Sequence, residues 1–299
     1  MRGLRGIWRT ALEPKTPPPV ALAPPQRMLS ARGLRPKDSF GQNFLAHEGL
    51  LRQMVALAEL NPGDRVIELG AGLGHLSQYL LETGAEIWAV EKDRDMAQIL
   101  REHAWPRFHV VEENAVKTEF AVLTAQPEGK VVGNLPYHLS APLLFSVLRQ
   151  ASFVRCALFC LQREVVDRLV APPGNRSYGL LSVLLGHKFA LEKLLSIPAR
   201  CFFPAPKVDS AVLRMRRLPS PRGQVKDEAR FVRLVKAAFS RRRKTLANAL
   251  KSDMGLFELQ SIPQSLEAAQ LDGGRRPETL SAEEFARLEA VLPLPLPPP

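Results

Sequence analysis

The sequence is poor in cysteine and has no long apolar segment. Its three cysteines (Cys156, Cys160 and Cys201) include no close Cys-x-x-Cys pair, which argues against a disulfide framework and favours a reducing compartment. No run approaches the roughly 18 apolar residues that a membrane-spanning helix needs, so we expect no membrane association. The six histidines form no cluster with metal-ligand spacing. We therefore predict no metal site.

Acidic residues are also scarce relative to basic ones. The chain has 30 Asp and Glu against 41 Lys and Arg, a formal net charge of +11. That excess favours a polyanionic partner, although ribosome-associated, DNA-binding and merely basic proteins all share it. At 299 residues with 45% hydrophobic residues, the chain has material for one large globular domain, with or without a small one.

The two ends of the chain lack hydrophobic periodicity. Residues 1–37 carry eight Lys and Arg against a single acid, Glu13, and are rich in proline from Pro14 to Pro25. We predict a disordered basic arm there, which could be a transit peptide, an RNA-tethering arm or a variable tail. Residues 293–299 form a second proline-rich tail.

Between the tails, short β-rich runs alternate with helical stretches. Alternation of this kind predicts an α/β fold with a doubly wound, mainly parallel sheet over residues 38–218. After the linker Pro219–Gly223 the pattern becomes purely helical, which predicts a small all-helical domain over residues 224–292. The expected strands are Arg65–Leu69, Glu86–Glu91, Phe108–Glu112, Lys130–Gly133, Val154–Leu161, Phe189–Leu195 and Val208–Arg214. The expected helices of the sheet domain are Glu48–Leu60, His75–Glu82, Arg94–His103, Ser140–Gln150, Glu164–Val170 and Gly179–Gly186.

A glycine-rich turn follows the first of these strands. Gly70 and Gly72 would let the backbone approach a ligand closely, and Glu91 ends the next strand, where a carboxylate can bind both hydroxyls of a ribose. A dinucleotide fingerprint would need a small residue at position 75, which is His75. The Glu-x-Gly-x-Gly start at Glu68 is the usual methyltransferase form, so we favour an adenosyl cofactor.

Asn114 follows the third strand, where such folds normally place an acid that contacts the adenine amine of the cofactor. An amide oxygen can still accept a hydrogen bond there, but the group also carries donors and lacks charge. The alternative is a loop or helix-capping asparagine.

The segment Asn134-Leu-Pro-Tyr137 follows the fourth strand, at the edge where α/β ligands bind. The N6 of adenine is a poor nucleophile because its lone pair is delocalised into the ring. The side-chain oxygen of Asn134 and the carbonyl of Pro136 could hold both amine hydrogens and aim the lone pair at a methyl donor. Tyr137 would stack on the extruded base. The sequence therefore predicts methylation of an adenine amine.

With these motifs the chain closely resembles the ribosomal RNA adenine N6,N6-dimethyltransferases, the bacterial small-subunit dimethyladenosine transferases, over about residues 38–292. Gly70, Glu91 and Asn134–Tyr137 match the family's glycine turn, ribose acid and catalytic loop, while Asn114 stands where the family usually has Asp. Further matches are the amino-terminal motif Phe40–Leu45, the helix start Leu161–Val165, the loop Phe202–Val208 and the basic segment Ser240–Leu246.

The resemblance implies roles for further residues. Asn43 and Leu45 would line the methionine end of S-adenosylmethionine, together with Asn134. Phe202 would stack on the base opposite Tyr137, with a core aromatic as the alternative. The cluster Arg241, Arg242, Arg243 and Lys244 would lie on an RNA-facing helix, or else form a solvated helix face.

The resemblance also implies a function, a Rossmann-like S-adenosylmethionine-dependent enzyme that dimethylates two adjacent adenosines near the 3′ end of small-subunit ribosomal RNA. We expect a monomer that acts on the pre-ribosomal small subunit in the bacterial cytoplasm, with the basic arm raising the mitochondrial relatives as an alternative. Two other functions stay open. One is the antibiotic-resistance type of large-subunit adenine methyltransferase, and the other is a non-catalytic ribosome-assembly factor on the same fold.

Overall fold

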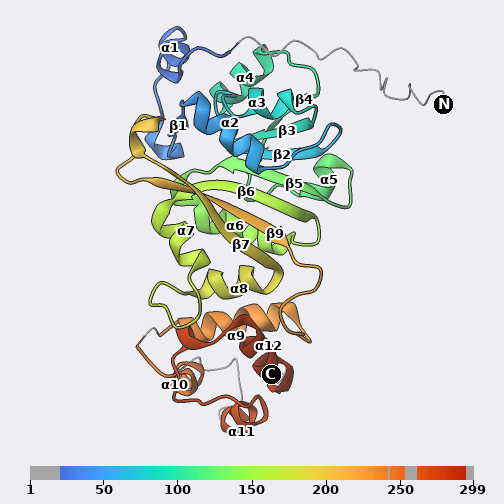
Figure 1. The fold of residues 1–299 in the computed structure, drawn as a ribbon, viewed down its shortest axis with the longest axis vertical. Coiled ribbons are helices and arrows are strands. Elements are labelled where there is room, and N and C mark those ends of the chain that lie inside the picture. Colours follow the sequence, from blue (N-terminus) through green and yellow to red (C-terminus); the bar gives the residue numbers. More distant parts are fainter. Residues whose placement is uncertain (1–20, 242, 253–260, 294–299) are drawn as a thin grey trace, which may run out of the picture.

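The computed structural model describes residues 21–241, 243–252 and 261–293 as an elongated body (Figure 1). A short helix lies at one end, a twisted sheet flanked by helices fills the middle, and a helical domain forms the other end.

Seven strands form the main sheet in the order β4-β3-β2-β5-β6-β9-β7. The pairings from β4 to β6 are all parallel, whereas β9 runs antiparallel to both β6 and β7. The strands are β2 (Arg65–Leu69), β3 (Glu86–Glu91), β4 (Phe108–Glu112), β5 (Gly129–Asn134), β6 (Val154–Gln162), β7 (Phe189–Ile197) and β9 (Ser210–Arg217). A separate two-stranded sheet pairs β1 (Phe44–Leu45) with β8 (Phe202–Phe203).

Helices cover both faces of the main sheet (Figure 1). One core packs α5, α6, α7 and α8 against the sheet, and a second packs α2 and α3 against the opposite face. The helices of this part are α1 (Pro25–Ser30), α2 (Glu48–Leu57), α3 (Ser77–Glu82), α4 (Arg94–Glu102), α5 (Phe120–Thr124), α6 (Ser140–Arg149), α7 (Arg163–Val170) and α8 (Leu180–Lys188). Because both faces are covered, the central strands read as continuous apolar runs.

The carboxyl-terminal domain is helical within its described residues. It contains α9 (Glu228–Phe239), α10 (Leu246–Lys251), α11 (Ser261–Ala268) and α12 (Ala282–Val291). A buried ion pair joins two of these helices, because the Arg230 Nε donates to Glu289 Oε1 at 2.5 Å and both side chains are at most 4% exposed. The expectation of an α/β sheet domain followed by a small all-helical domain is confirmed.

The predicted strands agree closely with the observed ones. β2, β3 and β4 have the expected bounds, and the others differ by at most three residues at either end. The pattern gave no hint of β1, β8 or α5, which span two to five residues each and are too short to show a period.

The prediction of a disordered arm through residue 37 is wrong for the part that the structure describes. Helix α1 buries Met28 and Leu29 in a small core with Leu73 of the glycine turn. The backbone of the preceding segment is also anchored, because Leu22 N donates to the Gln78 side chain at 3.1 Å. A short apolar patch therefore outweighs the basic, proline-rich composition here. Residues 1–20, the rest of the predicted arm, lie outside the described residues, as do residues 294–299 of the predicted tail.

The domain boundary is less sharp than the linker suggests. Helix α8 belongs to the sheet domain by sequence, yet its Val183 and Leu184 pack in the core of the helical domain with Leu234 and Phe285. The linker itself is tied to the end of α8, because Arg222 N donates to the His187 carbonyl at 2.8 Å. The two parts share one continuous interface.

Candidate active site

A cavity opens at the carboxyl ends of β2, β3 and β5, where the parallel strands present their following loops side by side. Every residue that the sequence assigned to cofactor binding lines this cavity, namely Asn43, Leu45, Gly70, Gly72, Glu91, Asn114 and Asn134. Two of the predicted catalytic residues, Pro136 and Tyr137, line it as well. The sheet thus brings together segments that lie far apart in the sequence.

The glycine turn closes one side of the cavity with a backbone that other residues would resist. Gly70 and Gly72 have φ of +73° and +58°, in the left-handed region that favours glycine. A Cβ at Gly72 would also come within 3.0 Å of the Phe44 ring. The turn is therefore shaped for close approach, with the β1 strand packed against it.

Glu91 presents a fixed carboxylate to the cavity. Its Oε2 accepts a hydrogen bond from Gly72 N at 2.8 Å and its Oε1 accepts one from Asp93 N at 2.9 Å. A carboxylate has about four acceptor positions, so capacity is left for two ligand hydroxyls. Glu91 is 9% exposed, and this burial raises the pKa of its carboxyl group.

A second buried carboxyl group, Glu68, lines the same cavity. Ser77 Oγ donates to its Oε2 at 2.6 Å, and burial raises the pKa of Glu68 to about 8. Two buried carboxyl groups favour a cationic ligand, which would lower both pKa values by favouring the ionised forms. S-adenosylmethionine, with a sulfonium, an ammonium and a ribose diol, fits this set of groups.

Asn134 is held by the amino-terminal segment. Its Nδ2 donates to the Asn43 carbonyl at 2.8 Å, across 91 residues of sequence. Asn43 is in turn fixed by its own side chain, which donates to the Gly41 carbonyl at 3.1 Å. This bond fixes the orientation of the Asn134 amide, whose Oδ1 can accept a hydrogen bond from a substrate amine.

The rest of the catalytic loop is equally well fixed. The Pro136 carbonyl accepts from Leu139 N at 2.9 Å and keeps a second lone pair for a ligand. The hydroxyl of Tyr137 lies 2.6 Å from Ser210 Oγ, and burial raises the pKa of Tyr137 to about 12. Tyr137 therefore stays protonated at neutral pH. Its hydroxyl does not act as a proton acceptor, and the face of its ring is the part that can contact a substrate.

Two predicted residues are placed differently from the others. Asn114 lines the cavity, but its Oδ1 accepts from Val116 N at 3.1 Å, a turn-forming contact that matches the interpretation as a loop asparagine. Phe202 is 5% exposed and packs in the core with Leu45 and Ile197. It is not among the described residues that line the cavity, so the structure does not bring it opposite Tyr137.

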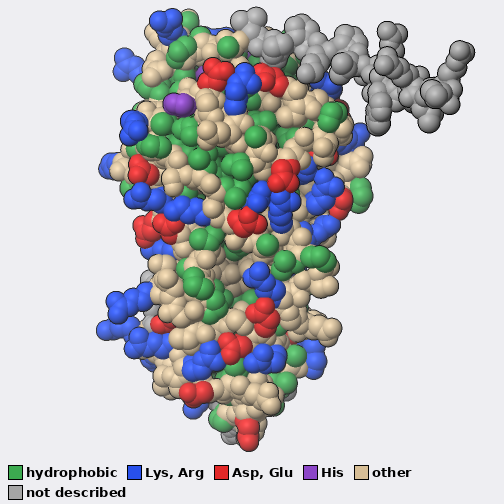
Figure 2. Space-filling model, viewed as in Figure 1, with side chains coloured by type: hydrophobic (Ala, Val, Ile, Leu, Met, Phe, Trp, Pro, Cys, Tyr) green, Lys and Arg blue, Asp and Glu red, His purple; other side chains and the backbone are tan. Residues whose placement is uncertain are grey.

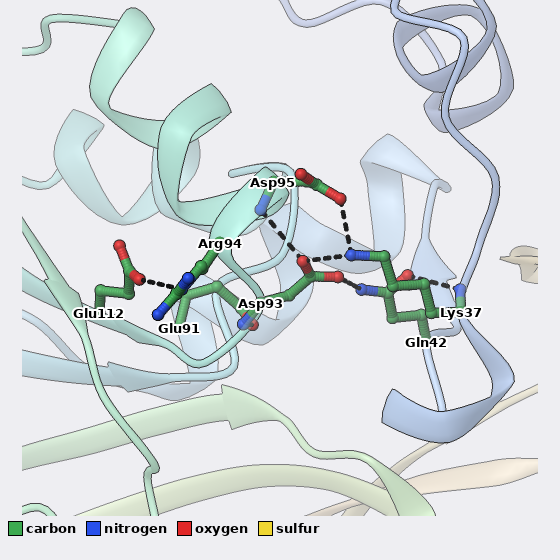
Figure 3. Close-up of polar contacts among 7 residues, drawn as sticks. All are labelled: Lys37, Gln42, Glu91, Asp93, Arg94, Asp95 and Glu112. Carbon is green, nitrogen blue, oxygen red and sulfur yellow. Dashed lines mark hydrogen bonds and ion pairs between the residues drawn. The ribbon is translucent and has the colours of Figure 1, made fainter.

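A polar network that the sequence did not reveal anchors the amino-terminal segment beside Glu91 (Figure 3). Lys37 Nζ contacts Asp93 Oδ1 and Asp95 Oδ2, both at 2.6 Å, and Gln42 Nε2 donates to Asp93 Oδ2 at 2.7 Å. The Asp93 side chain is 1% exposed. Since the Asp93 amide also binds Glu91, this network joins the segment that holds Asn134 to the carboxylate that would hold the ribose.

The basic cluster lies in the helical domain, far from the cavity in sequence. Arg241, Arg243 and Lys244 are exposed, and Arg242 lies outside the described residues. The prediction that the cluster is on a helix is wrong, because the three described residues fall in the turn between α9 and α10. Figure 2 shows basic side chains gathered on one side of this end of the molecule.

The described residues contain no group of three or more His, Cys, Asp or Glu side chains arranged to hold a metal ion. Among the helices of these same residues, none has the length and apolar character needed to cross a membrane.

The fold and the cavity together define a Rossmann-like, S-adenosylmethionine-dependent methyltransferase. A family model described as ribosomal RNA adenine dimethylase matches residues 33–292. The chain belongs to this family.

Two relatives extend the match over most of the chain. The "Ribosomal RNA small subunit methyltransferase A" of Myxococcus xanthus (strain DK1622) is 51% identical over 268 residues, which cover 90% of this chain and 95% of the relative. The protein of the same name from Anaeromyxobacter dehalogenans (strain 2CP-C) is 48% identical over 278 residues, 90% of this chain and 97% of the relative.

Solved structures share the fold. A dimethyladenosine transferase from Plasmodium falciparum superposes with a TM-score of 0.69 at 23% identity, over 82% of this chain and 95% of that one. The 23S rRNA methyltransferase ErmE gives a TM-score of 0.63 at 25% identity, over 84% and 99%.

Proposed function

We propose that this protein dimethylates N6 of two adjacent adenosines near the 3′ end of small-subunit ribosomal RNA and contributes in this way to ribosome biogenesis. The hydrogen bond from Asn134 Nδ2 to the Asn43 carbonyl carries the chemical part of the proposal, because it orients the amide of a residue that lines the cavity with Glu68 and Glu91 and keeps its oxygen as an acceptor. The small-subunit substrate is supported by the names of relatives that are 51% and 48% identical.

Bound S-adenosylmethionine supplies an electrophilic methyl group. Its ribose hydroxyls would be held by Glu91, its adenine would lie towards Asn114, and its methionine end would lie along Asn43 and Leu45, all of which line the cavity.

The residues of the catalytic loop then act on the adenine amine. Asn134 Oδ1 and the Pro136 carbonyl would accept hydrogen bonds from its two N–H groups, which would draw the lone pair out of conjugation with the ring and towards the methyl group. The new bond from N6 to the methyl group would replace the sulfur–methyl bond of the donor, and the amine would lose one proton to water. Tyr137 offers its ring face to the base, held in place by Ser210. Both acceptors are fixed before the substrate arrives, so little reorganisation accompanies the transfer. Phe202 would have to leave its core position to stack on the opposite face.

The RNA would be held at a distance from this chemistry by the basic cluster Arg241, Arg242, Arg243 and Lys244, of which Arg241, Arg243 and Lys244 are described and exposed. We also propose that the enzyme works as a monomer and acts in the bacterial cytoplasm; the bacterial source of its relatives supports the second part.

The large-subunit alternative is the less favoured one. It is supported by the shared fold of ErmE, but that enzyme is 25% identical to this chain, about half the identity of the small-subunit relatives. The non-catalytic alternative is also less favoured, because Glu91, Asn134, Pro136 and Tyr137 all line one cavity.

A methylation assay tests the proposal. Purified protein and S-adenosylmethionine are incubated with small subunits that lack the modification, and with large subunits as a control, and the modified nucleotides are mapped by mass spectrometry. We expect two adjacent dimethyladenosines near the 3′ end of the small-subunit RNA. Methylation of large-subunit RNA alone, or cofactor binding without any transfer, would contradict the proposal.

A further inference from the structure

A second cavity lies between the sheet domain and the helical domain, and it starts at the catalytic loop. Tyr137 lines both this interdomain cavity and the cofactor cavity, with His138 and Ser140 next to it in the second one. The interdomain cavity has a volume of about 750 Å³, which is within the range of pockets that hold small organic molecules.

Aromatic rings from both domains line the interdomain cavity. Phe145 comes from α6 of the sheet domain and Phe239 from the end of α9 in the helical domain, and both are partly exposed. Tyr178, just before α8, also lines the cavity, but it is 6% exposed and packs in the core of the helical domain. Nucleobases stack on such rings with little regard to sequence, because every base has a π-face.

Positive charge surrounds these rings. Arg168, Arg176 and Arg276 line the cavity with a single acidic residue, Glu278. Lys236 adds to them, since its Nζ lies 5.3 Å from the centre of the Phe145 ring. The contact of Arg168 with Glu164 is an exposed pair, which is weak enough to be exchanged for a phosphate. Rings beside several cations suit a nucleotide with its phosphate.

The cavity is built into the fold by contacts between its walls. Gly174 N, in the loop after α7, donates to the Glu278 carbonyl of the helical domain at 2.8 Å. Ser182 Oγ of α8 donates to the Arg168 carbonyl at 2.6 Å. The first bond ties the sheet domain to the helical domain beside the cavity, and the second fixes α8 against α7 within the sheet domain.

We propose that the interdomain cavity binds the nucleotide adjacent to the target adenosine, with its base against Phe145 and Phe239 and its phosphate at the arginines. This inference rests on the proposed function, which places the target base at Tyr137. The neighbouring nucleotide is one backbone step away, and the cavity begins at that same residue. Two adjacent adenosines could then occupy the two sites in turn, one being methylated while the other is held.

Binding of short RNA tests this inference without relying on turnover. Three fluorescent single-stranded RNAs carry the target adenosine with both neighbours intact, with the 5′ neighbour abasic, or with the 3′ neighbour abasic. Their dissociation constants are measured for the full-length wild type, for Phe145→Leu, which keeps apolar volume but removes the ring, and for Arg276→Gln. Arg233→Gln is the matched control, because Arg233 is an exposed cation of α9 that does not line the cavity.

We expect one abasic RNA to bind the wild type about tenfold more weakly than the intact RNA, the scale of one base–aromatic stack. Phe145→Leu should bind intact RNA about as weakly as the wild type binds that abasic RNA. Its affinity should fall little further when the abasic RNA replaces the intact one, because the two changes delete the same contact. Arg276→Gln should weaken the binding of all three RNAs and lower the salt dependence of binding. Arg233→Gln should bind like the wild type, with the same difference in affinity between intact and abasic RNA.

Two results would overturn the inference. The first is that both abasic RNAs bind the wild type as tightly as intact RNA does. The second is that removing the base weakens RNA binding by the same factor in the wild type and in Phe145→Leu. Thermal unfolding of each variant verifies that it is folded. Failure of the proposed function is recognised separately, because wild-type protein would then leave small-subunit adenosines unmethylated in the assay described above.

Discussion

The cofactor end and the helical end of this protein place their ionisable groups in opposite ways. At the cofactor end, Glu68 and Glu91 are at most 9% exposed, and each is held by a short hydrogen bond from Ser77 or from the backbone. At the helical end, Arg241, Arg243 and Lys244 are exposed in a turn. The first arrangement uses a few buried groups of fixed position, and the second uses several exposed cations.

This difference has an energetic consequence. A buried carboxylate is weakly screened, so its loss changes the binding of one ligand strongly. Exposed cations each contribute little and are screened by salt, yet their sum governs the binding of a polyanion. Cofactor binding should therefore depend on single residues, and RNA binding on the total charge of a surface.

The largest effect should come from Asn134→Ala. The change removes an acceptor that acts on the amine only as N6 becomes nucleophilic, so turnover should fall by about 100-fold or more, the scale for losing one preorganised polar group. Cofactor and RNA binding should change far less. Single-turnover rates on unmodified small subunits check this, and a turnover within a few-fold of wild type would remove Asn134 from the reaction.

Glu91→Ala should weaken S-adenosylmethionine binding by about 1–3 kcal/mol, because two ligand hydroxyls lose their partner. Calorimetry measures the effect. Glu112→Ala is the matched control, since Glu112 ends the neighbouring strand β4 and pairs with exposed arginines. Equal affinities for wild type and a folded Glu91→Ala protein would rule out the ribose role.

Lys37→Met should weaken cofactor binding by about 1 kcal/mol, since it leaves the buried Asp93 without its ammonium partner and loosens the segment that carries Asn43. Arg94→Met is the control, because Arg94 is 89% exposed and pairs with Glu112 outside the network (Figure 3). If both variants bind the cofactor alike, the network has no part in shaping the cavity.

Neutralising Arg241, Arg242, Arg243 and Lys244 together should leave cofactor affinity unchanged and weaken RNA binding. Each lost phosphate contact should lower the slope of log affinity against log salt by about one unit. RNA affinity measured over a series of salt concentrations gives the slope. Parallel lines for wild type and the quadruple variant would show that the cluster is only a solvated surface.

The smallest effect should come from Asn114→Asp, because a carboxylate can accept from Val116 N as the amide oxygen does. Cofactor affinity should be equal or slightly higher, and Asn114→Ala should lower the free energy of unfolding by about 1 kcal/mol. Calorimetry and denaturant unfolding separate the two effects. A large loss of cofactor affinity in a stable Asn114→Ala protein would show that its side chain binds the ligand directly.

Local patterns explain why the sequence predicted the cofactor end so well. An apolar run that ends in a glycine turn, followed one βαβ step later by Glu91, depends only on neighbours along the chain. The parallel sheet then brings Asn114 and Asn134 to the same edge by its topology, so strand order alone places them.

Features that depend on contacts between distant segments were not predictable. Lys37 and Asp93 are 56 residues apart, and β1 pairs with β8 across more than 150 residues through two positions each. Neither leaves a period in the sequence. The same limit applies to Phe202. The sequence does not distinguish an aromatic residue that faces a ligand from one that, as here, packs in a core.

The sharing of α8 between two cores bears on how this molecule could be divided. Cutting the chain at the linker would leave Val183 and Leu184 facing water on one fragment and Leu234 and Phe285 on the other. Neither fragment would be a self-sufficient folding unit, and heat should melt the whole protein in one cooperative step. The helical end is thus not an exchangeable module, and a chimera that borrows it from a relative would have to borrow α8 as well.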